Sequence, residues 1–213
     1  MKVTLISATQ AVDGGDFEST LVEIARVSSS RKNKKFEPSG LIGYLIKNRH
    51  WSPFEMMSMC VEITTSRAIS LQIVRHRSFA YQQFSQRYAA STEMEFVDIR
   101  RQAADNRQSS TERFNPLIRG FPADKKIGKH LENSKRLYTD LIEAGVAKET
   151  ARFVLPATTQ TRLYMNGTMR SWIHYLEIRD DEHAQLEHRR IAIEIKKIFV
   201  NLMPHTSKAL GWI

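Results

Sequence analysis

Residues 75–88, RHRSFAYQQFSQRY, combine three arginines and a histidine with four aromatic side chains and almost no aliphatic ones. A guanidinium group binds phosphates and carboxylates through paired charged donors. Aromatic faces stack on flat rings, the bases of nucleic acids included. The mixture therefore suits either a nucleic acid or a bound nucleotide or flavin, and the other motifs of the chain must distinguish these ligands.

The preceding residues, SRAISLQIVRHR, predict a helix that runs into this segment. On such a helix Gln72, Arg75 and His76 stand at positions i, i+3 and i+4, so an amide, a guanidinium and an imidazole project from one face. A solvated basic helix end, where cations complement the helix dipole, explains the same spacing. This motif alone leaves both interpretations open.

An extended chain after Tyr81 places Gln83, Ser85 and Arg87 on the same side, because side chains alternate with period two. Such an amide, hydroxyl and guanidinium can together hold a phosphate. The alternative is a polar edge strand. That alternative accounts for the charges, and it accounts for the aromatic neighbours only if these belong to the core.

Two further pairs repeat the combination of charges and rings. Glu149 and Arg152 stand at i, i+3, a spacing typical of ordinary surface ion pairs. Arg170 and His174 stand at i, i+4 on either side of Trp172, and could face a flat anionic ring system. We expect Trp172 itself to be a core residue.

Composition limits the classes of protein that remain. The 213 residues suit one domain, and 41% hydrophobic with 26% charged residues is typical of a folded soluble protein. The formal net charge of +9 favours anionic ligands without distinguishing polymers from small phosphates. A lone cysteine, Cys60, excludes an internal disulfide and favours a cytoplasmic setting, and we expect it to be a buried structural thiol. No apolar run is long enough for a membrane span, and the apolar stretch at the start is too short for a secretory signal. The seven histidines lack metal-ligand spacing.

The elements that must position these residues follow from periodicity. Strands are predicted for the first ten residues, for 57–66 and for the segment before the Asn166-Gly167 pair. We interpret that pair as a turn and Thr168 as the cap of the helix that follows. Residues 97–126 are weakly periodic and predict a surface excursion. Helices are predicted at 17–29, 38–48, 66–77, 124–144, 147–155, 168–179 and 184–203. The mixture favours a single α+β domain over 1–213 with a long C-terminal helix.

Together the motifs match a family. The segment RHRSFAYQQFS resembles the signature of the flavin-dependent thymidylate synthases, in which RHR is followed by seven residues and a serine. Five other blocks follow that family's order, and the resemblance covers nearly the whole chain outside 97–126. The blocks are ARVSS (25–29), HWSPFE (50–55), ETARFVLP (149–156), NGTMRSWIHYLEIR (166–179) and AQLEH (184–188).

The resemblance implies the family's fold, with a central mostly antiparallel sheet flanked by helices. It also implies a homotetramer whose active sites are shared between subunits. It implies methylation of dUMP at C5, with 5,10-methylenetetrahydrofolate as carbon donor and NADPH-reduced FAD as reductant. All of these ligands are anionic, in agreement with the mixture of cations and rings. It implies no metal, no membrane association and no nucleic-acid partner. The competing interpretation is a basic protein that binds single-stranded nucleic acid, for which no RNA-binding signature is present.

Site residues are carried over from the matching motifs. The resemblance implies that flavin contacts are Ser28, Ser52, Glu55, Arg75, His76, Arg77, Gln83, Thr168, Met169, Arg170, His174 and His183. It implies that dUMP contacts are Gln72, Ile73, Val74, Arg75, Gln83, Phe84, Ser85, Gln86, Arg87, Arg152 and Arg179, with residues 83–87 supplied by a neighbouring subunit.

Arg179 matches the arginine that acts on N3 of the uracil. There it stabilises negative charge on the pyrimidine and makes C5 more nucleophilic. From its acidic neighbours alone, the sequence predicts a salt-bridge network around Arg179. Ser85 has no general base near it in the sequence, so we assign it to dUMP binding and not to nucleophilic attack. Gln82-Gln83 departs from the Asn-Glu that many members carry, which removes a negative charge near the ligands.

Overall fold

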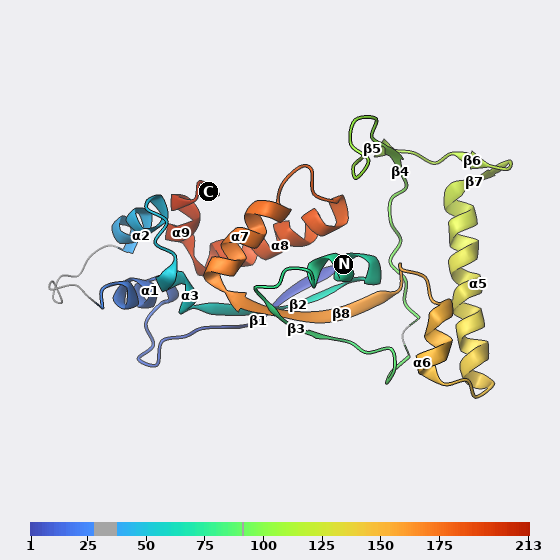
Figure 1. The fold of residues 1–213 in the computed structure, drawn as a ribbon, viewed down its shortest axis with the longest axis horizontal. Helices are drawn as coiled ribbons and strands as arrows, with labels where there is room; N and C mark the ends of the chain where they lie inside the picture. Colours follow the sequence, from blue (N-terminus) through green and yellow to red (C-terminus); the bar gives the residue numbers. More distant parts are fainter. Residues whose placement is uncertain (28–37, 91) are drawn as a thin grey trace.

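A four-stranded antiparallel sheet forms the centre of the computed structural model, which describes residues 1–27, 38–90 and 92–213. Its strand order is β1-β2-β8-β3, and the connections are visible in Figure 1. The strands are β1 (Lys2–Ala8), β2 (Ser58–Ser66), β8 (Gln160–Thr168) and β3 (Ala80–Gln83). In the middle of the sheet Val61 pairs with Leu5 of β1 and with Met165 of β8.

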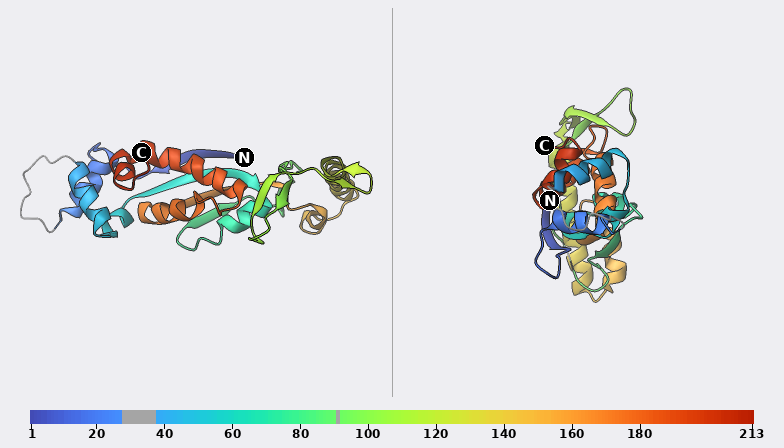
Figure 2. Two further views of the ribbon diagram at one scale, coloured as in Figure 1. Left: turned by 90° about the horizontal axis from the view of Figure 1, so that it is seen from above. Right: turned by 90° about the vertical axis from the view of Figure 1, so that its left-hand side faces the viewer.

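Helices cover one face of this sheet (Figures 1 and 2). They include α4 (Arg67–Ile73), α7 (Met169–Arg179) and α8 (Leu186–Leu202). Along β2 the inward side chains Met59, Val61 and Ile63 are fully buried, while the alternate side chains are only partly buried. This period-two pattern is the one that the sequence predicts for 57–66. Each such buried apolar side chain contributes about 1.5–3 kcal/mol.

Four short helices close one end of the sheet: α1 (Phe17–Ala25), α2 (Pro38–Lys47), α3 (Ser52–Glu55) and α9 (Pro204–Ala209). A buried carboxylate joins the first of them to the last. Glu18 accepts hydrogen bonds from the backbone N–H groups of His205 at 2.9 Å and Thr206 at 2.7 Å, and from the Thr206 hydroxyl at 2.7 Å. This carboxylate therefore ties α1 to α9.

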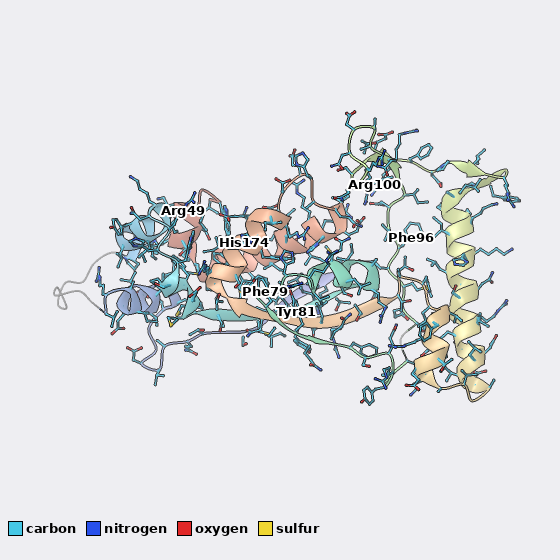
Figure 3. All side chains as sticks on the ribbon, viewed as in Figure 1. Arg49, Phe79, Tyr81, Phe96, Arg100 and His174 are labelled. Carbon is cyan, nitrogen blue, oxygen red and sulfur yellow. The ribbon has the colours of Figure 1, made fainter. Side chains whose placement is uncertain are left out.

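The opposite end of the molecule carries an extension that we call the arm, residues 97–146 (Figure 2). It comprises β4 (Arg100–Gln102), β5 (Ser110–Arg113), β6 (Leu117–Ile118), β7 (Phe121–Pro122) and α5 (Ala123–Glu143), and it is followed by α6 (Lys148–Ala151) and the 3-10 helix η1 (Arg152–Val154). Only Ala123 and Tyr138 of α5 are buried. Leu117 and Phe121 stay exposed, as does Phe96 just before the arm (Figure 3).

The α+β class with an antiparallel sheet, flanking helices and a long C-terminal helix is confirmed, and the strand and helix positions agree closely with prediction. Residues 97–122 are largely exposed and hold only short hairpins, and the end of the predicted excursion, from Ala123, already belongs to α5. The division into a single domain stays a prediction. In the described parts of the chain no helix is long and apolar enough to cross a membrane.

Two local predictions are wrong. The helix predicted over 66–77 ends at Ile73, because the Tyr81 hydroxyl donates to the carbonyl oxygens of Ile73 at 2.8 Å and His76 at 2.9 Å, so the chain turns back. The Asn166-Gly167 pair is no turn but continues β8 up to the α7 cap. Glycine is required there because a Cβ on Gly167 would lie 2.4 Å from Cδ1 of Phe79.

Candidate active site

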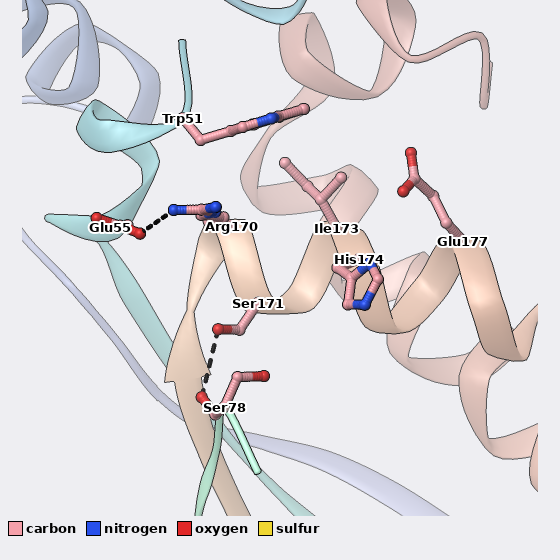
Figure 4. Close-up of a pocket in the computed structure, with 8 residues that line it drawn as sticks. All are labelled: Trp51, Glu55, Ser78, Arg170, Ser171, Ile173, His174 and Glu177. Carbon is pink, nitrogen blue, oxygen red and sulfur yellow. Dashed lines mark hydrogen bonds and ion pairs between the residues drawn. The ribbon is translucent and has the colours of Figure 1, made fainter. Parts of the chain in front are cut away.

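A cavity of about 450 Å³ opens where β8 passes into α7 (Figure 4). Thr168 begins the helix, and its hydroxyl accepts from the backbone N–H of Ser171. The partial positive charge of this helix end favours an anion. Charged and aromatic side chains from two parts of the chain line the cavity, namely Trp51, Glu55, Arg170, His174 and Glu177. Arg170 forms an ion pair with Glu55, which ties α7 to α3.

A second cavity, of about 520 Å³, adjoins the first and shares Trp51 and Arg170 with it. Its other lining residues include Ser52, His50 and Arg49. Figure 3 shows Arg49 on the side of the molecule that carries the N-terminal helices, and His174 nearer the centre. The two cavities together offer cations, hydroxyls and one large aromatic ring to an elongated ligand.

The RHR residues lie in the turn after α4. Arg75 and Arg77 are exposed, and His76 is half-buried. The Nε of Arg179, at the end of α7, donates to Nε2 of His76 at 2.9 Å. Because Nε2 accepts this bond, the proton of the imidazole is on Nδ1. The predicted common helix face is therefore wrong. Gln72 lies on α4, but Arg75 and His76 lie beyond the end of that helix.

The electrostatic environment keeps His76 neutral. Burial, and then the nearby Arg179 and His174, lower the pKa of His76 from 6.5 to about 4. A neutral imidazole can accept the Arg179 hydrogen bond, whereas an imidazolium could not. His76 thus fixes one edge of the guanidinium and leaves its Nη groups as donors. Within the described ranges the predicted salt-bridge network around Arg179 is not found, and the neighbouring Asp180 pairs instead with Lys196 at 2.7 Å.

A third group of polar side chains lies near α6, beyond the end of β3. Arg87 pairs with Glu149 at 3.4 Å, and Arg152 Nε donates to the Glu149 carbonyl at 3.2 Å. Arg67 and Gln86 line a cavity of about 250 Å³ with Arg152. Among the described residues, no hydrogen bond or ion pair joins this group to the cavity at α7. The chain therefore presents two separate sets of candidate ligands.

The predicted common side of Gln83, Ser85 and Arg87 is wrong. β3 ends at Gln83, whose amide donates inward to the hydroxyls of Ser70 and Thr161 at 3.0 Å each. The chain then turns, and the Ser85 hydroxyl accepts from the backbone N–H of Arg87 at 3.3 Å. Tertiary hydrogen bonds thus override the local alternation.

Several of the site residues implied by the family resemblance are buried or make contacts within the fold. Ile73 and Met169 are fully buried in the core, so neither presents its side chain to a ligand. Val74 caps α4, and the backbone N–H of Phe84 donates to the Arg162 carbonyl at 2.8 Å. His183 pairs with Asp181 at 2.8 Å beside the arm, in a cavity of about 240 Å³ that differs from the α7 cavity.

Ser28, predicted to contact the flavin, lies outside the described residues. Trp172 is buried in the core, which confirms its prediction. Cys60 is half-buried on the outer face of β2 rather than fully buried, because none of the described helices covers that face (Figure 1). Burial raises the pKa of its thiol. The described residues contain no group of three or more His, Cys, Asp or Glu side chains that could hold a metal ion.

The sequence analysis missed four side chains that the structure places at or next to these groups. They are Arg67, Trp51, Tyr175 and His188. Arg67 Nη1 donates to Gln86 Oε1 at 2.8 Å. Trp51 stands inside the quoted block HWSPFE, so its position beside Ser52 was the available signal. Tyr175 and His188 likewise stand inside the quoted blocks 166–179 and 184–188, but their contact partners are distant in sequence, so their roles had no local signal.

These features define an α+β protein with an enzyme-like pocket suited to elongated anionic ligands. The chain belongs to the family described as "Thymidylate synthase complementing protein", whose model matches residues 4–205. It is 43% identical to a flavin-dependent thymidylate synthase of Synechocystis sp., over 100% of both chains. It is 41% identical to a probable flavin-dependent thymidylate synthase of Paramecium bursaria Chlorella virus 1, again over 100% of both. It is 33% identical to a flavin-dependent thymidylate synthase of Thermosipho melanesiensis, over 91% of this chain and 84% of that protein.

Proposed function

We propose that this chain is a flavin-dependent thymidylate synthase, which methylates C5 of dUMP to form dTMP. The carbon donor is 5,10-methylenetetrahydrofolate, and the reductant is FAD reduced by NADPH. Similarity over the full length to proteins of that name supports the assignment. The observation that carries it is the bond between Arg179 and His76, which places a fixed guanidinium at the RHR turn. Family membership favours this enzyme over a single-strand-binding module.

The residues at the two adjoining cavities fit FAD. Arg170, Ser52 and the amino end of α7 offer charged and neutral donors suited to a pyrophosphate, and Trp51 and His174 offer flat rings. The combined lining is polar, cationic and aromatic, as a flavin dinucleotide requires. When bound, FAD supplies the reducing hydride that turns a transferred methylene group into a methyl group. Glu55 orients Arg170 through their ion pair.

Arg179 is the residue that we assign to the chemistry of the substrate. Its guanidinium stabilises the negative charge that develops on N3 and the carbonyl oxygens of the pyrimidine, which raises the nucleophilicity of C5. His76 holds the guanidinium through Nε, so the Nη donors are oriented before the substrate arrives. Arginine acts here as an electrostatic group and takes up no proton.

Ser85, Gln86, Arg87 and Arg152 are assigned to the dUMP of a neighbouring subunit in a homotetramer. Their separation from the α7 cavity within one chain supports shared sites. The exposed apolar residues of the arm and the uncovered outer face of the sheet offer surfaces for self-association. A cytoplasmic setting and the lack of a nucleic-acid partner remain part of the proposal, supported by the single cysteine and the family's small-molecule substrates.

Growth without thymidine of a bacterial host that lacks its own thymidylate synthase tests this function. We expect the chain to restore growth and Arg179→Ala to abolish it. Arg113→Ala, at an exposed arginine of β5 that pairs with Asp98 at 3.0 Å, is the matched control and should restore growth. Failure of the parent chain despite soluble expression would contradict the proposal. Growth with Arg179→Ala would remove that residue from the mechanism.

A further inference from the structure

A chain of hydrogen bonds connects a buried tyrosine to the arm through the end of α4. Tyr175 OH lies 3.0 Å from Nε2 of His188, and Nδ1 of His188 lies 3.4 Å from Oε1 of Gln72. The Gln72 amide nitrogen donates to Gln185 Oε1 at 2.5 Å, and the Gln185 amide nitrogen donates to Glu187 at 3.0 Å. Tyr175 and His188 are both fully buried.

The far end of this chain is the carboxylate of Glu187, which offers only acceptors and forms an ion pair with Arg100. Arg100 of the arm donates to both carboxylate oxygens of Glu187, at 2.6 and 3.0 Å, and the two side chains are only 11% and 9% exposed. Burial opposes ionisation of Glu187, but hydrogen bonds, chiefly that from Arg100, hold the pKa of its carboxyl below the usual value. An ionised carboxylate accepts and never donates.

The direction of every other bond follows from that carboxylate. Glu187 requires the amide nitrogen of Gln185, so Gln185 turns its oxygen toward Gln72. Gln72 must then donate through its own nitrogen and direct its oxygen to His188. An amide oxygen only accepts, so His188 carries its proton on Nδ1, and its Nε2 accepts from the Tyr175 hydroxyl.

The surroundings agree with a neutral His188. Burial, and then Arg179 and His76, lower the pKa of His188 from 6.5 to about 3. The ring centroid of His76 lies 6.2 Å from that of His188 and 4.9 Å from that of Tyr175. The same buried cluster thus packs against the imidazole that holds Arg179.

We propose that Tyr175 and His188 are positioning residues for Gln72, because their hydrogen bonds fix its amide with the nitrogen available to donate a second hydrogen to the nucleotide. This inference rests on the proposed function, in which Gln72 contacts dUMP. It adds two buried residues that contact no ligand themselves and act through the Gln72 side chain. It also assigns Gln185 and Arg100 to the same role: Gln185 accepts from the Gln72 amide, and Arg100 binds the Glu187 carboxylate that orients Gln185.

Two variants of nearly equal shape test the proposal. His188→Asn keeps an N–H donor close to the position of Nδ1, whereas His188→Leu has no donor. Equilibrium binding of dUMP to the FAD-containing protein is measured by calorimetry, together with the KM for dUMP, the KM for NADPH and kcat. We expect His188→Leu to raise the dissociation constant and the KM for dUMP about tenfold, in line with the loss of one buried hydrogen bond. The KM for NADPH should not change, and His188→Asn should bind dUMP within about threefold of the parent.

Equal dUMP dissociation constants for the Leu and Asn variants would overturn the inference while leaving the proposed function intact. A parent protein that binds FAD but not dUMP would overturn both. If His188→Leu does not fold, Tyr175→Phe and Gln185→Met carry the test, since each removes hydrogen bonds and keeps the side-chain shape. Each should raise the KM for dUMP about threefold. Unchanged values for both would refute the positioning role.

Discussion

Replacing Gly167 with alanine tests how closely the sheet and the RHR turn are packed. The added Cβ would lie 2.4 Å from Cδ1 and 2.6 Å from Cε1 of Phe79, closer than nonbonded carbon atoms approach. Phe79 cannot simply rotate away, because its ring packs on that of Trp172 with centroids 4.6 Å apart. Figure 3 shows Phe79 beside Tyr81 at the centre of the molecule. The alanine must therefore displace the ring or the strand.

Overpacking of a well-packed core by one methyl group costs about 1–3 kcal/mol. The distance from the added Cβ to the Phe79 ring is far below contact distance, so we expect the free energy of unfolding to fall by about 3 kcal/mol. For a chain of this size, 1 kcal/mol corresponds to about 2–4 °C, so the melting temperature should fall by about 6–12 °C. Ser78, next to Phe79, accepts a hydrogen bond from Ser171 at the cavity, so FAD affinity should fall as well.

Thermal unfolding followed by circular dichroism measures this effect, with FAD content read from absorbance. Gly43→Ala in α2 is the control, because a Cβ there meets no atom within 4 Å. It should stabilise the protein by up to about 1 kcal/mol, as alanine favours a helix interior. Phe79→Leu in the Gly167→Ala background should recover part of the loss. A melting temperature for Gly167→Ala within about 2 °C of the parent would refute the packing argument.

Three further predictions concern other parts of the molecule. Glu18→Gln weakens the three hydrogen bonds that Glu18 accepts from His205 and Thr206, and should cost about 2 kcal/mol in urea unfolding; a change below about 0.5 kcal/mol would contradict this. The pKa of His188 is about 3 in the folded protein against 6.5 ordinarily, so the unfolded chain takes up a proton first and stability falls from about pH 6.5 downward. His188→Asn should therefore lose about 2 kcal/mol less than the parent between pH 7.5 and 5, and equal losses would refute a neutral His188. Arg170→Ala should weaken FAD binding at least about tenfold in fluorescence titrations, since it removes the cation paired with Glu55; unchanged affinity would place FAD elsewhere.

The sequence was sufficient to predict the sheet and most helices because their signals are local. Period-two alternation marks β2, and helical spacing marks α1, α5 and α8. The end of α4 could not be predicted from local periodicity, because it depends on the hydroxyl of Tyr81, eight residues away, which donates to the Ile73 carbonyl. Gly167 was interpreted as a turn residue because glycine is common in turns, whereas here it makes room for Phe79.

The candidate site shows the same contrast between local signals and contacts that are distant in sequence. Arg170 and His174 are one helical turn apart, so their shared cavity followed from spacing. Arg179 and His76 are 103 residues apart, and their direct contact could come only from the folded chain. His188 contacts Gln72 across 116 residues, so this contact too could come only from the folded chain. Family resemblance supplied the candidate ligand residues, while the structure supplies the partners that hold them.

The most direct test of the proposed enzyme is the reaction itself with purified protein. FAD-loaded protein is mixed with dUMP, 5,10-methylenetetrahydrofolate and NADPH without oxygen, and dTMP and oxidised NADPH are measured by chromatography. We predict equal amounts of the two products, formed only when FAD is present and lost with Arg179→Ala. NADPH oxidation without dTMP, or dTMP formed equally well by protein stripped of FAD, would contradict the assignment.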